Sequence, residues 1–165
     1  MPQKIGAILL VIAVVFSGQA WSRYRHHHRH NGYRPPIGSL YAMKASWYGK
    51  CGYENGQWIC HYHGRQTASG VIFDMRNPHM VAHPSLALGS KLHICSRYSC
   101  IWAIVVDRGP YVGNRQLDAS QAGAIALGYR DRGVETLRVT YMGHVSNYKA
   151  IFEDMAARRQ FASFF

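Results

Sequence analysis

Acidic side chains are scarce in this chain, so a carboxyl group that follows an apolar segment is a candidate for chemistry. The 165 residues contain 8 Asp and Glu against 19 Lys and Arg. Two of the acids, Asp107 and Asp118, lie in the segment AIVVDRGPYVGNRQLDAS. Asp107 directly follows the apolar run IWAIVV, where partial desolvation raises the pKa of a carboxyl group toward the range of a general acid. We therefore expect Asp107 to transfer a proton.

Both aspartates also have structural interpretations. Asp107 precedes Arg-Gly-Pro, and an Asp at such a position commonly fixes a turn through hydrogen bonds to the backbone. Asp118 stands just ahead of the Ala-rich stretch ASQAGAIALG, where it would serve as a helix N-cap, with Gly128 ending the helix. The residues alone leave each aspartate open between a chemical and a structural role.

The segments that must position these residues have mostly strand character. From Met43 onward the chain contains short apolar runs separated by Gly, Pro and Asn, namely MKASWYG, KLHIC, IWAIVV and TLRVTYMG. Only residues 119–128 have helical composition inside the domain. Near the C-terminus, Ile151, Phe152 and Met155 are close to helical spacing. The sequence predicts a mainly β domain with one embedded short helix and a C-terminal helix.

The N-terminal residues have the composition of an export signal. Lys4 precedes an apolar run over residues 5–16, and Gly18 and Ala20 occupy the small positions that signal peptidase prefers. We expect residues 1–20 to be a signal peptide of a periplasmic or secreted protein. The alternative is an N-terminal membrane anchor, although the run is shorter than the roughly 20 residues that a span requires. We expect no stable membrane span and, with no Cys near the cleavage point, no lipid anchor.

Residues 21–43 form a basic, His- and Pro-rich segment without an apolar period, which predicts a flexible lead-in. Its histidines allow two interpretations, a solvated tail or a segment that binds metal or adheres to anionic polymer. The formal net charge of +11 favours polyanionic partners. Because an exported chain meets cell-wall polymers first, we expect anionic cell-wall polymers as partners and no nucleic acid. The sequence predicts no oligomeric state.

Four cysteines in an exported chain indicate disulfides rather than free thiols or a metal site, because the compartment is oxidising. Three pairings are possible. We expect Cys51–Cys60 and Cys95–Cys100, since each pair encloses a short segment rich in turn-forming residues.

Seven motifs in order resemble the double-psi β-barrel domain of the rare lipoprotein A family. They are ASWYG at 45–49, HGRQTASG at 63–70, FDM at 73–75, AHPSLALGS at 82–90, VVDRGPYVGNRQLDAS at 105–120, ALG at 126–128 and GVETLRVTYMG at 133–143. The resemblance covers residues 44–143 and leaves residues 144–165 as a C-terminal helical extension. It implies a six-stranded double-psi β-barrel with a groove for a polysaccharide. It also implies a lytic transglycosylase that cleaves peptidoglycan glycan strands and leaves 1,6-anhydro-muramyl ends, without a cofactor.

The resemblance further implies a catalytic set of three residues. The family's acid corresponds to Asp107, its His to His83 and its second Asp to Asp118. A His at a strand-to-turn junction is more often structural, and the resemblance leaves His83 evenly open between a structural and a catalytic role. Where the family usually has an acid directly after TASG, this chain has Val71.

Three residues beside the catalytic set are candidates for substrate binding. Trp47 and Tyr48 offer flat apolar faces for sugar rings, and Arg108 offers a cation for hydroxyl or anionic groups. Because side chains alternate along a strand, we expect at most one of Trp47 and Tyr48 to face the groove.

The absence of an acid at position 71 bears on which reaction the chain could catalyse. Glycoside hydrolysis normally uses two carboxyl groups, whereas a lytic transglycosylase uses the C6 hydroxyl of its own substrate as nucleophile and needs one. The missing acid is therefore compatible with lytic transglycosylation. It also leaves open a non-catalytic, expansin-like module that binds cell-wall glycan, while a nucleic-acid binder rests on charge alone.

Overall fold

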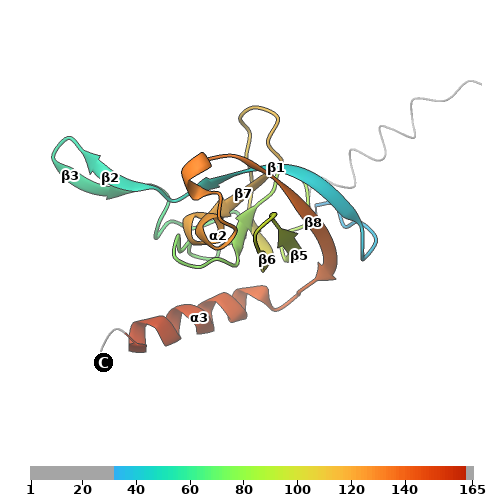
Figure 1. Cartoon of the computed structure of the whole chain (residues 1–165). Helices are drawn as coiled ribbons and strands as arrows, with labels where there is room; N and C mark the ends of the chain where they lie inside the picture. The colour runs from blue at the N-terminus through green and yellow to red at the C-terminus, as the bar shows by residue number, and fades with distance from the viewer. Residues whose placement is uncertain (1–31, 163–165) are drawn as a thin grey trace, which may run out of the picture. The chain divides into compact units, whose positions relative to one another are not determined.

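The computed structural model describes residues 32–162, with side chains up to Arg158. Six strands close into a barrel (Figure 1). The order around the barrel is β1-β7-β4-β6-β5-β8. The bounds are β1 Leu40–Tyr48, β4 Met80–Ala82, β5 Ser90–Cys95, β6 Cys100–Asp107, β7 Leu117–Ser120 and β8 Glu135–His144. This arrangement confirms the predicted six-stranded double-psi β-barrel.

The remaining elements lie outside the barrel wall. Strands β2 (Cys51–Glu54) and β3 (Gln57–Cys60) form an antiparallel hairpin that extends away from the barrel (Figure 1). Two short helices, α2 (Gln121–Ala126) and the 3-10 helix η1 (Arg130–Arg132), connect β7 to β8, and α3 (Tyr148–Ala162) follows β8. The predicted embedded helix and C-terminal helix are both confirmed. Within the described residues, no helix is long and apolar enough to cross a membrane.

The expected signal peptide and residues 21–31 of the lead-in lie outside the described residues. The described end of the lead-in is tied to the domain, because Tyr33 N–H donates to the Ser85 carbonyl and the Tyr33 carbonyl accepts from Ala87 N–H. Strand β1 begins at Leu40 and pairs there with Thr140 of β8. Residues 40–43, predicted to be the end of the lead-in, therefore belong to the barrel.

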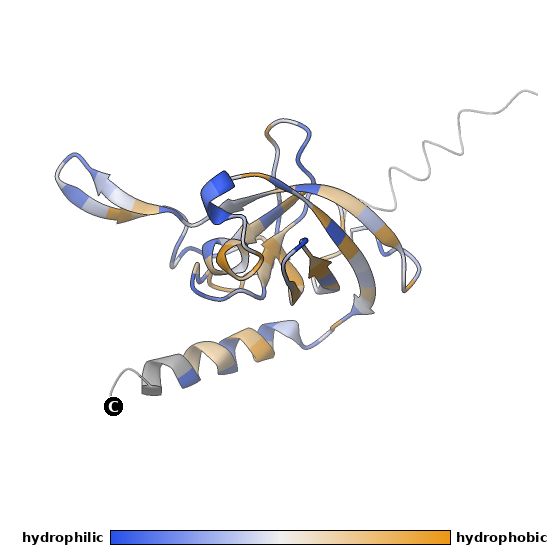
Figure 2. Cartoon of the chain, viewed as in Figure 1, coloured by the Kyte–Doolittle hydropathy of each residue, from blue (hydrophilic) through white to orange (hydrophobic). Residues whose placement is uncertain are grey.

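The main core fills the barrel with the inward residues of each strand. Along β8, Leu137, Val139 and Tyr141 are buried while Arg138 is exposed, the period-two pattern of a strand with one face in the core. Figure 2 shows the same alternation as bands of polar and apolar colour on β8. Tyr129, just after α2, adds a fully buried ring whose hydroxyl donates to the Ser46 carbonyl at 2.8 Å.

A second core lies between the barrel and α3. Val71, Phe73, Met80 and Val106 of the barrel side form one buried cluster with two residues of α3, Tyr148 and Phe152. The helix is thus held to the barrel by Tyr148 and Phe152, whereas Ile151 is exposed.

The N-cap of α2 differs from the expected one. Ser120 is the N-cap, and its hydroxyl accepts the Gly123 N–H at 3.0 Å. Asp118 lies two residues earlier, inside β7, so the interpretation of Asp118 as the helix cap is wrong. Strand β7 continues to Ser120 because its residues pair with β1, and this pairing moves the start of the helix past Asp118. Gly128, with φ +73°, follows the helix end as expected.

All four cysteines form disulfides, Cys51–Cys60 and Cys95–Cys100, in the pairing expected from the sequence. Each disulfide joins directly paired residues of two antiparallel strands, β2 with β3 and β5 with β6. The Cys95–Cys100 disulfide therefore encloses the turn of a hairpin, and the Cys51–Cys60 disulfide encloses a whole hairpin.

Candidate active site

Four neighbouring strands bring two carboxyl groups to one row of the barrel wall. Ala82 of β4 pairs with Asp107 of β6 on one side and with Asp118 of β7 on the other, and Asp118 pairs in turn with Ser46 of β1. With neighbouring strands about 4.8 Å apart, the Cα atoms of the two aspartates lie roughly 10 Å apart. The row therefore reads Ser46, Asp118, Ala82, Asp107.

This row forms one wall of a cavity of about 430 Å³. The other lining residues come from the end of β1, from Tyr62 and from the loop between β6 and β7, and they are Trp47, Tyr48, Tyr62, Arg108, Gly109, Pro110, Tyr111, Val112 and Arg115. Two carboxyl groups, two guanidinium groups and four aromatic rings thus meet in one hollow.

Asp107 is held by backbone N–H groups on one oxygen. Its Oδ1 accepts from Ala68 N–H at 2.9 Å and from its neighbour Arg108 N–H at 2.8 Å. Ala68 belongs to a tight turn in which the Thr67 hydroxyl donates to the Val71 carbonyl and contacts the Ser69 hydroxyl. Within the described residues, Oδ2 of Asp107 accepts no hydrogen bond, so this oxygen is free for a proton. Asp107 thus fixes the turn with one oxygen, as its structural interpretation expects, and leaves the other oxygen to the cavity.

Asp118 is more enclosed. Its Oδ1 accepts the Ser46 hydroxyl at 2.8 Å. Burial raises the pKa of Asp118 above its ordinary value, and the nearby Asp107 carboxylate adds to this rise, while the Ser46 hydrogen bond and the Arg115 guanidinium oppose it. Sequence reasoning missed both Ser46 and Arg115, although Ser46 lies in the quoted ASWYG motif.

Trp47 and Tyr48 both line the cavity, so the expectation that only one could face it is wrong. Alternation fails here because Tyr48 is the last residue of β1 and Gly49, with φ +96°, turns the chain directly after it. The two rings are not equally available. Tyr48 stacks on Phe73 with ring centroids 4.1 Å apart, which covers one of its faces, and the Trp47 indole N–H donates to the Arg130 carbonyl at 2.9 Å.

The Tyr48 hydroxyl is buried and has no hydrogen-bond partner among the described residues. Burial, with the Asp107 and Asp118 carboxylates nearby, raises the pKa of Tyr48 well above its usual value. The hydroxyl beside the two acids therefore stays protonated and neutral.

Two further aromatic residues of the cavity, Tyr62 and Tyr111, escaped sequence reasoning. Tyr111 is 76% exposed and stands in the GPYVG stretch that follows Asp107. Tyr62 meets Tyr48 edge to face at 5.9 Å. An exposed aromatic next to a candidate acid was the available signal for Tyr111, whereas Tyr62 depends on a tertiary contact.

His83 contacts Asp107 through backbone atoms only. His83 N–H donates to the Asp107 carbonyl at 3.2 Å, and its ring Nδ1 accepts from Ser85 N–H at 3.1 Å and Leu86 N–H at 3.0 Å. Burial, with the Arg108 cation adding to the effect, lowers the pKa of His83 to about 4. A neutral imidazole therefore organises the turn after β4, and it is not among the residues that line the cavity.

Arg108 bridges the cavity and this turn. Its Nη1 donates to the Leu86 carbonyl at 2.8 Å and to the His83 carbonyl at 3.3 Å, and the residue also lines the cavity. The guanidinium is thus anchored at one side and still adds positive charge to the cavity wall.

Val71 does not line the cavity. Its side chain is 7% exposed and packs in the second core with Phe73 and, from α3, Tyr148 and Phe152. An acid at this position would meet apolar side chains of the C-terminal helix. Val71, which stands where the family usually has an acid, is therefore an apolar residue in apolar surroundings.

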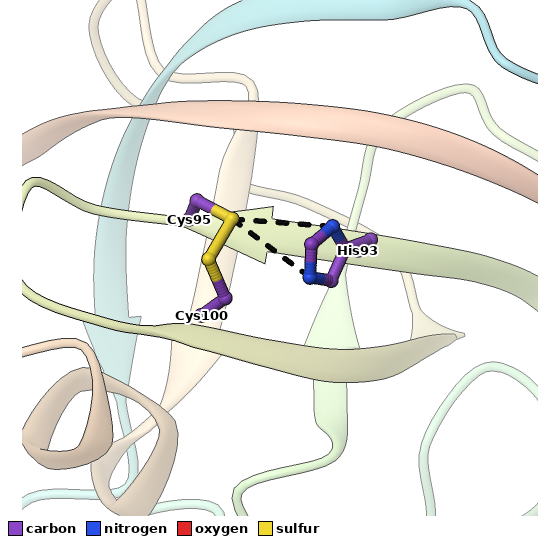
Figure 3. A group of neighbouring side chains, drawn as sticks. All are labelled: His93, Cys95 and Cys100. Carbon is purple, nitrogen blue, oxygen red and sulfur yellow. Dashed lines mark hydrogen bonds between the residues drawn. A yellow bond between two sulfur atoms is a disulfide. The ribbon is translucent and has the colours of Figure 1, made fainter.

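His93 lies beside the Cys95–Cys100 disulfide on β5 and β6 (Figure 3). The nitrogen of His93 and the two sulfur atoms fall within 4.8 Å of one another, a grouping that could hold a metal if the thiolates were free. In the structure both sulfurs are consumed by the disulfide. This group does not line the cavity, and it offers a single ordinary ligand, the imidazole.

The closed barrel and the cavity that holds Asp107 and Asp118 define a double-psi β-barrel with a candidate active site on its wall. Residues 41–141 match the double-psi β-barrel family described as lytic transglycolase, and the chain belongs to this family of rare lipoprotein A-like proteins. The endolytic peptidoglycan transglycosylase RlpA of Rickettsia typhi is 34% identical over 100 residues, which are 59% of this chain and 29% of the relative. RlpA of Neisseria meningitidis serogroup A is 31% identical over 118 residues, 67% of this chain and 45% of the relative.

The chain spans less than half of the length of these two relatives. Among solved structures, the Streptomyces papain inhibitor aligns with a TM-score of 0.49 at 22% identity, over 66% of this chain and 99% of that chain. This likeness is too low to support an argument.

Proposed function

We propose that this chain cleaves the glycan strands of peptidoglycan as an exported lytic transglycosylase and leaves 1,6-anhydro-muramyl ends. The observation that carries the proposal is the free Oδ2 of Asp107 on the wall of a cavity that is rich in aromatic residues. The family and the two RlpA relatives support the same substrate and reaction class. Action on peptidoglycan requires a place outside the cytoplasm, in agreement with the expected export signal.

Asp107 acts first as acid and then as base. Its Oδ2 proton passes to the glycosidic oxygen as the bond from C1 to that oxygen breaks. The resulting carboxylate then takes the proton of the C6 hydroxyl of the same sugar, and the C6 oxygen bonds to C1. Atoms and charge balance without water, and Asp107 returns to its protonated state. The two N–H groups on Oδ1 keep the carboxyl group in place through both steps.

Asp118 serves as the second polar group of the cavity. Its raised pKa makes this carboxyl group easier to protonate than an exposed Asp, and when protonated its hydroxyl can donate to a sugar oxygen without repelling Asp107. The Ser46 hydroxyl fixes its orientation.

His83 and Arg108 act as positioning residues for Asp107. His83 holds the turn after β4 through two N–H groups, and Arg108 joins that turn to the cavity through the His83 and Leu86 carbonyls. Trp47, Tyr62 and Tyr111 supply ring faces for the sugar units.

Positive charge adds a second, less specific attraction to the cell wall. The net charge of +11 supports binding to anionic cell-wall polymers, and we expect it to weaken as salt screens charges over roughly 8 Å at physiological ionic strength. Residues 21–31 can be deleted to test the contribution of the lead-in, because this deletion spares both β1 and Tyr33, whose backbone is hydrogen-bonded to Ser85 and Ala87.

Product analysis tests the proposal directly. Purified peptidoglycan is incubated with the protein over a range of pH, and the released fragments are identified by mass spectrometry. Anhydro ends support the lytic transglycosylase, and reducing ends indicate a hydrolase. Retention on peptidoglycan without any product would favour the non-catalytic glycan-binding module, for which the buried, apolar Val71 is the supporting observation.

A further inference from the structure

The hairpin of β2 and β3 presents two large aromatic side chains that the barrel does not use. Tyr53 and Trp58 are directly paired across the hairpin, with ring centroids 5.0 Å apart and planes at 70°. They are 76% and 62% exposed. Because side chains alternate along a strand, both rings lie on the same face as the Cys51–Cys60 pair, two positions away.

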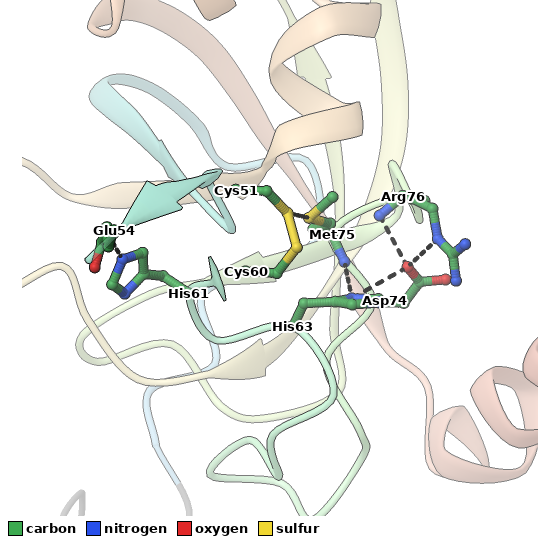
Figure 4. Close-up of a disulfide and its surroundings, with 8 residues drawn as sticks. All are labelled: Cys51, Glu54, Cys60, His61, His63, Asp74, Met75 and Arg76. Carbon is green, nitrogen blue, oxygen red and sulfur yellow. Dashed lines mark hydrogen bonds and ion pairs between the residues drawn. A yellow bond between two sulfur atoms is a disulfide. The ribbon is translucent and has the colours of Figure 1, made fainter. Parts of the chain in front are cut away.

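Two contacts fix the base of this hairpin, and a third joins the residue before its turn to the residue after β3 (Figure 4). The Cys51–Cys60 disulfide joins its two strands, and Cys51 Sγ lies 3.3 Å from Met75 Sδ. The Glu54 carboxylate pairs with His61 at 2.6 Å, so the acid of the hairpin already has a partner. The two rings are thus held on a braced support, which lowers the entropy cost of binding a ligand on them.

The hairpin is continuous with the wall of the candidate active site. It leaves the barrel after Tyr48 and returns at Tyr62, and both of these residues line the cavity and touch each other edge to face. A polymer that enters the cavity beside Tyr62 therefore passes the start of the hairpin.

We infer that the β2–β3 hairpin is a second binding surface for the glycan strand, in which Tyr53 and Trp58 contact sugar units outside the cleavage cavity. The inference rests on the proposed function for the identity of the polymer. Sugar rings have apolar C–H faces and polar edges, and Tyr and Trp offer flat apolar faces with a polar atom at the rim. A glycan strand is long enough to occupy the cavity and the hairpin together, so the two contacts reinforce each other.

The hairpin suits a polysaccharide better than a membrane surface. Its other exposed positions include Glu54, Asn55 and Gln57, so the rings form an isolated pair on a polar ribbon. An interfacial membrane contact generally uses a broad apolar face with basic residues on the other side. A sugar chain needs a smaller apolar surface than a membrane does, and a pair of rings on a polar ribbon provides it.

Co-sedimentation of the full chain with purified insoluble peptidoglycan tests the inference. The double variant Tyr53→Ser with Trp58→Ser should bind more weakly, by roughly twofold to tenfold for each ring lost. The double variant Tyr53→Phe with Trp58→Phe keeps both rings and should bind nearly as the parent does. The matched control is Tyr98→Ser, which removes a ring that is 61% exposed on the turn between β5 and β6. Circular dichroism and disulfide mapping verify that each variant is folded.

Cleavage of a short soluble glycan, too short to reach the hairpin, separates this inference from the proposed function. The serine variant should cleave the short glycan at the parental rate while it releases less product from intact peptidoglycan. If the parent binds peptidoglycan through the hairpin without cleaving either substrate, the binding surface stands and the enzymatic proposal fails. Parental binding by the serine variant, an equal loss in Tyr98→Ser, or hairpin-dependent binding to phosphatidylglycerol vesicles instead of peptidoglycan would each overturn the inference.

Discussion

Asp107→Asn separates the chemical role of Asp107 from its role in the turn. The amide oxygen of Asn can take the place of Oδ1 and accept both N–H groups, from Ala68 and Arg108, while the amide NH₂ replaces the free Oδ2. The amide cannot give up or accept a proton near neutral pH. We therefore expect a folded protein that has lost proton transfer.

The structure also sets the size of each effect. A positioned general acid typically contributes about 10²- to 10⁴-fold to the rate. Here the same group serves both steps, so the loss should lie at the upper end of this range. The free energy of unfolding should change by less than about 1 kcal/mol, because both backbone hydrogen bonds remain. In Asp107→Ala both N–H groups lose their acceptor, and the unfolding free energy should fall by roughly 2 kcal/mol or more.

The assay combines urea unfolding with mass spectrometry of anhydro-muropeptides from purified peptidoglycan. Binding to peptidoglycan is measured by co-sedimentation and should be nearly unchanged in Asp107→Asn. Full product release by a folded Asp107→Asn protein would refute the assignment of Asp107 as the acid. Equal destabilisation by Asn and Ala would contradict the expectation that the Asn amide oxygen replaces Oδ1 as the acceptor of the two N–H groups.

Three further substitutions test the surroundings of the acid. Asp118→Asn should reduce cleavage less than Asp107→Asn does. It should also raise the free energy of unfolding at pH 7, because a raised carboxyl pKa makes ionisation costly in the folded state. In urea unfolding, this gain should vanish below about pH 4, where Asp118 is protonated in both states. His83 has a pKa of about 4 in the folded protein, below its unfolded value. The free energy of unfolding of the parent should therefore fall by roughly 3 kcal/mol between pH 6.5 and pH 4 through this group. His83→Asn keeps an acceptor for the turn, and its free energy of unfolding should fall less over the same pH range. Val71→Glu places a carboxyl group in the second core and should cost about 3 kcal/mol or more, well beyond the cost of Val71→Ala; equal unfolding midpoints in urea for these two variants would contradict the placement of Val71 beside α3.

Local sequence patterns predicted the class of fold and several of its parts. The apolar runs indicated strands, and the Ala-rich stretch that Gly128 closes indicated the embedded helix, because strand and helix periodicity are properties of neighbouring residues. The pairing of Cys51 with Cys60 followed from turn-forming residues between them. The resemblance of ordered motifs then supplied the barrel and the candidate Asp107. Short strands such as β4 and the β2–β3 hairpin were too brief to give a periodic signal.

The tertiary structure decided how these residues meet. Strand register placed Asp107 and Asp118 on either side of Ala82, and register depends on pairings between segments far apart in the chain. The same pairing made Asp118 a strand residue and moved the helix cap to Ser120. By itself the sequence determined which residues could carry protons and which segments would be strands, since both are local properties. Only the closed barrel decided which carboxyl oxygen is free, because that depends on the backbone N–H groups that distant turns bring to it.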